Sequence, residues 1–403
     1  MKSLNLFLKN VPALFFSWSI TRYILFLFIT LKLPYPEGKW LKGDVELYDF
    51  WSISLVKGIF PISDSMWQYP PIAGFVISLA KFLFGNANLG FIFTMLLFDL
   101  IILIVLSIYG IYENKSNDIK FSGLIGSWFW VIWPIFMGPL LLTRFDLVPT
   151  LFAILSLIAI YHLRIGLTSF LITVGTLIKL WPLLLISIID RKYLKLIIFL
   201  VSIFTLVILI FTNLISVGWF GFLDNQSQRG LQVESVAAIF YVILGLFGLK
   251  VEYPFRYGSL EVNSVFSNQI SMFLNISTLI LFIIIFIFNL KQKFDHLNVF
   301  DKALIIIVLA IGLSRVFSPQ FYIWLGGLSA VALIQKDCQT KKIITFLSIS
   351  AVFSQILYPG LYVGLLSFEI FPTIIQLARI LFFIFALGLG LKLLFKPKLS
   401  KYV

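Results

Sequence analysis

The residues best suited to catalysis lie in an acid-rich stretch between Leu33 and Pro71, whose sequence is LPYPEGKWLKGDVELYDFWSISLVKGIFPISDSMWQYPP. It carries five carboxylates directly after the first apolar run. A carboxylate that aromatic rings shield from water has a raised pKa and can act as a general base on a hydroxyl group. Asp44 is the first candidate for this base, and Asp49, one helical turn further on, is the second. The simpler alternative is that Asp44 caps a helix that stops at Gly58, because Asp favours that position.

Three later polar motifs provide candidates for binding phosphate or hydroxyl groups. TRFDL at 143–147 fits either an ion pair at the membrane edge or an arginine that holds a phosphate. NQSQRGLQVES at 225–235 is either a solvated loop or part of a site. SRVFSPQFYIW at 314–324 places an arginine between two apolar runs, where a cation is costly unless an anion meets it. The residues that we single out in these motifs are Arg144, Asp146, Arg229, Gln232, Glu234, Arg315 and Gln320.

Two further charged residues fall inside apolar runs. Lys179 in LIKLWP is either paired within the protein or directed toward the membrane surface, and its cation is also a candidate to bind phosphate. Asp99 in LLFDL has no obvious partner nearby in the sequence, so its role stays open.

The composition indicates an integral membrane protein. With 60% hydrophobic and 12% charged residues, the 403-residue chain is too apolar for one soluble core. The net charge of +13 comes from Lys and Arg clusters between apolar runs, which is typical of cytoplasmic loops and not of a nucleic-acid site. A single cysteine, Cys338, excludes an intrachain disulfide, and the two histidines give no zinc pattern. We expect no metal or other cofactor, although Asp44, Glu46 and Asp49 form an alternative acidic metal site.

Apolar runs of roughly 20 residues predict helices that cross the membrane. The expected full spans are 10–32, 88–112, 121–140, 145–163, 194–217, 266–290, 300–315, 318–335, 341–358 and 370–394. The first of these contains Arg22 and lacks a signal-peptide cleavage site, so we expect a retained helix. The basic segments should be cytoplasmic, and they are the amino terminus, 113–120, 162–164 with His162, 190–195, 291–296 with His296, 336–342 and the carboxyl end.

The placement of the basic loops constrains three shorter runs. The run at 70–85 is too short to span and would reverse every later loop, so we expect an amphipathic or half-embedded helix on the outer surface. The run at 165–190 must go out and return as two short helices broken near Lys179 and Pro182. The run at 235–249 should be re-entrant or lie on the surface. About twelve crossings result, with both termini cytoplasmic and the polar motifs outside.

We therefore expect one membrane domain over 1–403. Its parts are a first outer loop at 33–87 with interfacial helices, the remainder of a core module at 88–217 and a variable set of helices at 218–403.

Several motifs, taken in order along the chain, resemble glycosyltransferase family 87. This family comprises polyprenol-phosphate-mannose-dependent mannosyltransferases of the GT-C superfamily. The amino-terminal likeness lies in a Gly-Asp pair followed four positions later by Tyr48, in KGIFP at 57–61 and in YPP at 69–71. TLIKLWPLLL at 176–185, RGLQVES at 229–235 and SPQFYIWL at 318–325 are similar to later segments of the family.

The resemblance implies a GT-C-like all-α fold and a cell-membrane enzyme that works on the extracytoplasmic side. It implies inverting transfer of one hexose, usually mannose, from a polyprenyl-phosphate donor to a hydroxyl of a glycolipid or glycan acceptor. Asp44 matches the position of the family's catalytic aspartate. Arg229, Arg315 and Lys179 are then the candidates to stabilise the leaving phosphate. Candidates to bind the sugar or acceptor are Tyr48, Tyr69, Arg144, Asp146, Gln232, Glu234 and Gln320.

Two other classes of protein remain as alternatives. A lipid or glycolipid transporter also needs many spans and intramembrane charges, but its polar groups usually lie near the membrane midplane and its sequence often repeats. Here the carboxylates cluster at the membrane edge and no repeat is visible. A non-catalytic scaffold would need none of these polar residues.

Overall fold

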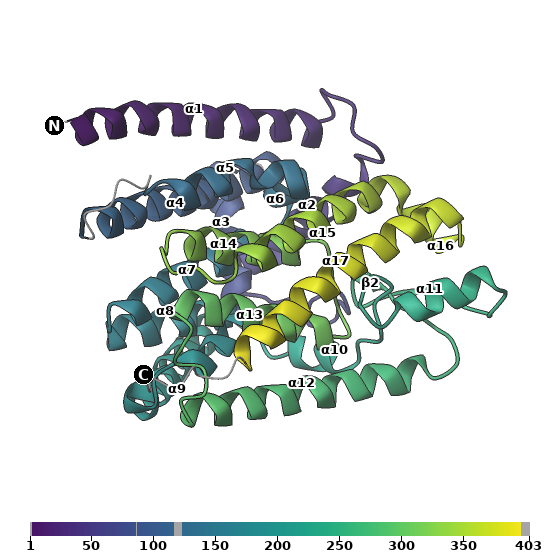
Figure 1. Cartoon of the computed structure of the whole chain (residues 1–403). Coiled ribbons are helices and arrows are strands. Elements are labelled where there is room, and N and C mark those ends of the chain that lie inside the picture. The colour runs from purple at the N-terminus through teal and green to yellow at the C-terminus, as the bar shows by residue number, and fades with distance from the viewer. Residues whose placement is uncertain (1, 86, 117–122, 396–403) are drawn as a thin grey trace.

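The computed structural model describes residues 2–85, 87–116 and 123–395, which form an almost entirely helical protein (Figure 1). Within these residues six segments are long and apolar enough to cross a membrane: Val11–Ile29, Asn88–Glu113, Arg191–Ile215, Ser267–Leu290, Lys341–Leu366 and Ile370–Leu394. Five of them lie in single helices: α1 (Lys2–Ile29), α4 (Ala87–Ser116), α9 (Arg191–Ile215), α12 (Ser267–Leu290) and α17 (Ile370–Leu394). The sixth, Lys341–Leu366, consists of α15 (Lys341–Ile356), a π-turn (Leu357–Leu361) and α16 (Tyr362–Leu366). The prediction of an all-α membrane protein is confirmed.

The remaining predicted spans form shorter helices than expected. The runs at 121–140, 145–163, 300–315 and 318–335 become α5 (Ile125–Met137), α7 (Leu147–Tyr161), α13 (Val299–Leu313) and α14 (Phe321–Leu333). At 1.5 Å per residue such helices reach only about 20–23 Å, whereas the hydrocarbon core is roughly 30 Å thick. Nearly all side chains of α13 and α14 are buried. Other helices therefore surround them, and their ends need not reach the membrane surface. Twelve crossings stays a prediction.

The run between 165 and 190 breaks where the sequence predicts. α8 (Ile165–Ile178) ends before Lys179, whose backbone is extended, and a 3₁₀-helix follows over Trp181–Ile188. Pro182 lies in the first turn of that helix, the only part that tolerates a residue without an N–H group. The run at 235–249 forms only the short helix α11 (Ile239–Leu246).

The predicted first outer loop contains two helices, α2 (Trp40–Leu55) and α3 (Pro71–Phe84). α2 begins after Lys39, so Asp44 lies within the helix and the alternative that Asp44 caps it is wrong. The predicted stop at Gly58 is confirmed, because its backbone is left-handed and a Cβ atom would meet the carbonyl oxygen of Ile215. α3 begins with Pro71, as the QYPP turn indicates, and packs against α2, α4 and α8.

A buried ion pair joins α1, α4 and α5. Arg22 contacts the carboxylate of Asp99 at 2.8 Å and donates to the backbone carbonyls of Trp130 and Val131 at 3.1 and 2.8 Å. The carbonyl of Trp130 needs this donor because Pro134, four residues later, has no N–H group to offer. The partner of Asp99 therefore lies 77 positions away in the chain.

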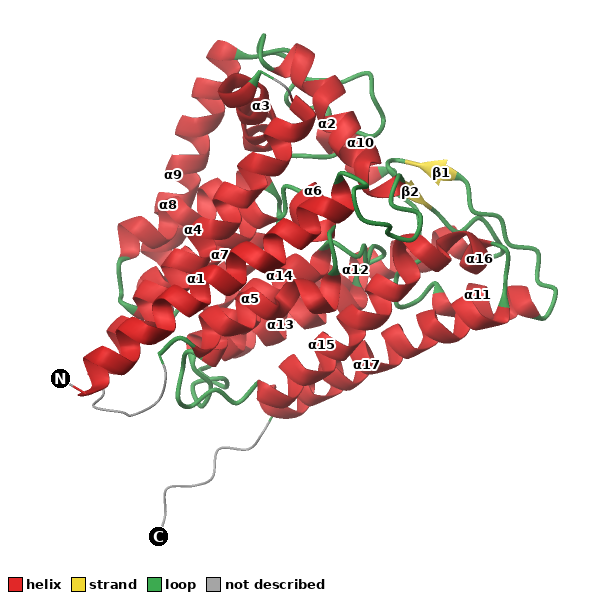
Figure 2. Ribbon diagram, turned by 90° about the horizontal axis from the view of Figure 1, so that it is seen from above, coloured by secondary structure: helices red, strands yellow, loops and turns green. Residues whose placement is uncertain are grey.

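The loops separate into two sets at opposite ends of the bundle. Basic loops meet at one end, where the ring of His162 lies 3.9 Å from Glu113 and the Gln339 side chain donates to the carbonyl of His296 at 3.0 Å. The amino-terminal end of α1 and the carboxyl-terminal end of α17 lie toward this side (Figure 2). The other end carries α2, α6 (Leu140–Thr143), α10 (Phe222–Ser227), α11 and a hairpin of β1 (Phe255–Arg256) and β2 (Ser259–Leu260).

Candidate functional site

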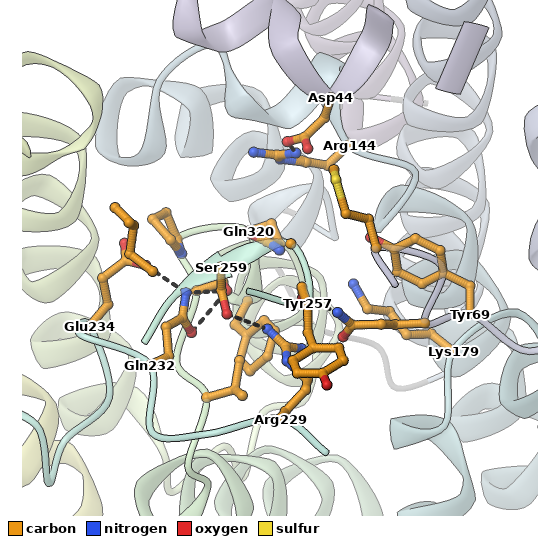
Figure 3. Close-up of a pocket in the computed structure, with 18 of the residues that line it drawn as sticks. Asp44, Tyr69, Arg144, Lys179, Arg229, Gln232, Glu234, Tyr257, Ser259 and Gln320 are labelled. Atoms are coloured by element: carbon orange, nitrogen blue, oxygen red, sulfur yellow. Dashed lines mark hydrogen bonds and ion pairs between the residues drawn. The ribbon is translucent and has the colours of Figure 1, made fainter. Parts of the chain in front are cut away.

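A cavity of about 920 Å³ opens among the polar loops at the second end of the bundle (Figure 3). Its walls come from α2, the turn before α3, the α6–α7 loop, the break after α8, the 225–234 loop, the β1–β2 hairpin and the 314–321 loop. These segments lie far apart in the sequence. Most of the predicted site residues line this cavity, namely Asp44, Tyr69, Arg144, Lys179, Arg229, Gln232, Glu234, Arg315 and Gln320.

Three predicted residues do not contribute to this lining in the described chain. Tyr48 of α2 is buried against α4, with the centroid of its ring 4.9 Å from that of Phe91. Asp49 is half-buried and lies 4.0 Å from Lys81 of α3. Asp146 is buried behind Lys179. The structure therefore favours Asp44 over Asp49 as the carboxylate with access to a ligand.

An ion pair between Asp44 and Arg144 forms one wall of the cavity (Figure 3). Asp44 comes from α2 and Arg144 from the extended residue that separates α6 from α7. Of the two alternatives for this motif, an ion pair between Arg144 and its neighbour Asp146 is therefore wrong, and a phosphate-binding Arg144 stays a prediction. The extended backbone at Arg144 turns the two side chains to different partners. Burial lowers the pKa of Arg144, and the neighbouring Tyr358, Asp146 and Glu234 oppose this shift.

Asp146 instead pairs with Lys179 at the base of the cavity. One carboxylate oxygen accepts from the Lys179 ammonium at 2.6 Å and from the Trp324 indole at 2.6 Å. The rings of Phe145 and Trp324 lie 5.3 and 5.2 Å from the ammonium nitrogen, and those of Tyr69 and Phe321 lie 5.9 Å away. Lys179 is therefore a paired cation within an aromatic cage and does not extend toward the membrane surface.

Two guanidinium groups, of Arg229 and Arg315, lie close together on another wall. Arg229 donates to the hydroxyl of Ser259 at 3.1 Å. Arg315 donates to the backbone carbonyls of Arg229 and Gln226, both at 2.5 Å. Neither forms an ion pair with a carboxylate in the described residues. Burial lowers the pKa of Arg229 to about 10, and the nearby charge of Arg315 adds to the effect, although Glu261 opposes it. Both remain cationic at neutral pH, so this wall favours an anion.

A third wall carries Gln232 and Glu234. The amide of Gln232 donates to Glu234 at 2.6 Å and to the hydroxyl of Ser318 at 2.8 Å, and its oxygen accepts from the backbone N–H of Phe317 at 3.0 Å. These bonds fasten the 225–235 loop to the 314–320 loop. Oε1 of Glu234 is buried without a hydrogen-bond partner among the described residues. Burial raises the pKa of Glu234 to about 7.

Several residues of the cavity were not singled out from the sequence. Tyr257 and Ser259 reach it from the hairpin, and Tyr358 and Tyr362 reach it from the end of the α15–α16 run. Arg379 of α17 is fully buried and donates to the backbone carbonyls of Glu234 and Phe317 at 3.0 and 2.7 Å. A cation inside a long apolar run was the available signal for Arg379.

The acidic metal site considered as an alternative is not formed. Across residues 2–85, 87–116 and 123–395, no three side chains of His, Cys, Asp or Glu gather as metal ligands. Glu46 and Asp49 lie on other faces of α2 than Asp44, which pairs with Arg144. 

Comparison with known proteins gives no match to this chain among protein-family models, curated proteins or solved structures.

Proposed function

We propose that this protein is a membrane hexosyltransferase that moves a sugar, mannose in the first instance, from a polyprenyl-phosphate donor to a hydroxyl of a glycolipid or glycan acceptor. One observation carries the proposal. A single cavity combines the carboxylate of Asp44 with the cations Arg229 and Arg315, which have no carboxylate partner in the described residues. The segments that line this cavity lie at one end of the bundle of apolar helices.

The two arginines supply the binding site for the donor phosphate. The two half-buried guanidinium groups repel each other, so an anion placed between them is attracted more strongly than it would be by either group alone. A phosphate oxygen is a good acceptor for guanidinium donors. Lys179 contributes less, because Asp146 already neutralises its charge.

The reaction is a single displacement. The acceptor hydroxyl attacks the anomeric carbon from the face opposite the phosphate, so the configuration inverts. Asp44 takes the hydroxyl proton as the new carbon–oxygen bond forms. The bond between the anomeric carbon and the phosphate oxygen breaks, and polyprenyl phosphate leaves as a dianion stabilised by Arg229 and Arg315. Gln232, Glu234 and Gln320 are placed to bind hydroxyl groups of the sugar or the acceptor. The family resemblance of the motifs supports the same chemistry.

Orientation follows from the basic loops. Because they gather at the end opposite the cavity, the proposal places the cavity on the extracytoplasmic side and both termini in the cytoplasm.

The test is transfer of radiolabelled mannose from polyprenyl-phosphate-mannose to a membrane-lipid extract. Purified wild type should form a labelled product, and Asp44→Asn should lose nearly all turnover. Asp49→Asn is the matched control and should stay active. Equal transfer by wild type and Asp44→Asn would remove Asp44 from the mechanism. No transfer by wild type from any lipid-phosphate sugar, with movement of the labelled lipid across vesicle membranes, would favour the transporter.

A further inference from the structure

The carboxylate of Asp44 is already occupied by Arg144. A general base needs a free oxygen lone pair directed at the proton it accepts. A guanidinium held against the carboxylate in a mostly buried site competes for that position. While the pair holds, Arg144 lowers the basicity of Asp44, and a change of partner by Arg144 restores it.

A second partner is available in the same cavity. Nε of Arg144 is a buried donor without a hydrogen bond among the described residues, and Oε1 of Glu234 is a buried acceptor without one. Both residues line the cavity, and their charges interact. Unpaired buried polar atoms are costly, so joining this donor and this acceptor offsets part of the cost of breaking the ion pair with Asp44.

Only Oε1 of the Glu234 carboxyl group is open to such a partner in the described residues, since Gln232 donates to Oε2 at 2.6 Å and Tyr362 lies within hydrogen-bonding reach of the group. Arg379 of α17 donates to the backbone carbonyl of Glu234, at 3.0 Å, and not to its carboxylate. Burial raises the pKa of this carboxyl to about 7, against the attraction of Arg379 and Arg144. The charged and titratable groups that face it are Arg144, Tyr322 of α14, Tyr358 of the π-turn, Tyr362 of α16 and Arg379.

We propose that Arg144 moves between two carboxylates, holding Asp44 in the resting cavity and turning to Glu234 when the acceptor hydroxyl binds. Asp44 is then free to take the hydroxyl proton. Glu234 is a positioning residue in this scheme, because it acts on the reaction through Arg144. The role in turnover rests on the proposed function, whereas the exchange of partners can be tested without it.

The test uses Asp44→Asn, which removes the charge of Asp44 and keeps its shape. Arg144 then loses its partner and should pair with Glu234, which lowers the pKa of Glu234 by roughly 1–3 units. Infrared difference spectroscopy on the full chain in detergent follows the C=O band of the protonated Glu234 carboxyl, identified by its loss in Glu234→Gln. The band should titrate at about pH 7 in wild type and at clearly lower pH in Asp44→Asn.

Two further variants control this measurement. Asp49→Asn removes a carboxylate outside the cavity and should leave the midpoint of Glu234 unchanged. Adding Arg144→Gln to Asp44→Asn should abolish the shift, because the cation that causes it is gone. An unchanged midpoint in folded Asp44→Asn, or a shift that survives the loss of Arg144, would overturn the proposal.

Turnover provides the second readout. Glu234→Gln should lower kcat at least tenfold with little change in donor KM, because Arg144 stays on Asp44. A raised KM with unchanged kcat would instead mean that Glu234 only binds a substrate hydroxyl, and would overturn the exchange. If wild type transfers no sugar, the proposed function fails, while the infrared midpoint still decides whether Arg144 reaches Glu234.

Discussion

Replacing Lys179 with methionine should reduce stability far more than it reduces affinity for the donor. In wild type the ammonium group donates to Asp146 at 2.6 Å, and Asp146 is 1% exposed. The variant leaves that carboxylate buried with the indole of Trp324 as its remaining side-chain donor. Removing one member of a buried pair typically costs about 3–5 kcal/mol, because the other charge stays in a low-dielectric site.

The double variant Lys179→Met/Asp146→Asn separates the two roles of Lys179. It removes both charges, and the new amide oxygen can still accept from Trp324. Most of the lost stability should therefore return, giving a coupling energy of about 2–3 kcal/mol in a double-mutant cycle. Unfolding in mixed detergent micelles, followed by tryptophan fluorescence, measures these free energies.

Donor kinetics show whether Lys179 also binds the phosphate. If Lys179 only neutralises Asp146, the double variant should keep the donor KM within about threefold of wild type, less than 1 kcal/mol. A KM raised by tenfold or more in the stably folded double variant would show that the ammonium binds the phosphate directly. An additive cycle would show that Lys179 and Asp146 do not stabilise each other.

Three other predictions concern the arginines of the cavity, the ion pair between Arg22 and Asp99, and the carboxyl group of Glu234. Arg229→Gln and Arg315→Gln should each raise the donor KM by roughly tenfold to a hundredfold, because each removes a charge-assisted hydrogen bond worth about 1.5–3 kcal/mol. Initial rates against donor concentration measure this KM, and an unchanged value in both variants would contradict the proposed phosphate site. Arg22→Met should lower the free energy of unfolding by about 3–5 kcal/mol in the same assay, and Arg22→Met/Asp99→Leu should recover most of this loss. No recovery would mean that Arg22 stabilises the protein mainly through its bonds to backbone carbonyls. In the folded protein Glu234 keeps its proton up to about pH 7, whereas in the unfolded chain it loses this proton near its ordinary pKa of 4.5. The free energy of unfolding should therefore fall as the pH rises from about 4.5 through 7. Glu234→Gln should flatten that slope, and an unchanged slope would contradict the raised pKa.

The candidate site shows where reading the sequence succeeds. Three cations that are costly in an apolar chain, Arg229, Arg315 and Lys179, line one cavity. The energetic penalty on isolated charges near lipid makes them visible without any structure. Arg379 is also a cation inside a long apolar run, but it was not predicted as a site residue.

The sequence did not reveal which charged residues pair with one another. Arg144 and Asp146 are separated by one residue, yet they bind Asp44 and Lys179. Asp99 is paired through an arginine 77 positions earlier. Charge pairing between helices depends on which helix faces meet. This depends on the packing of the whole bundle, so residues that are neighbours in the chain do not indicate it.

Hydrophobic content and backbone chemistry act locally, so the amino-acid sequence alone indicates the class of protein, the helical runs, the break at Lys179 and Pro182, and most of the polar residues of the cavity. The short lengths of α5, α7, α13 and α14, the position of Asp44 inside α2 and its pairing with Arg144 become visible in the three-dimensional arrangement. Those outcomes depend on long-range packing: a helix surrounded by other helices need not match the membrane thickness, and a buried charge takes whichever opposite charge the fold brings within reach.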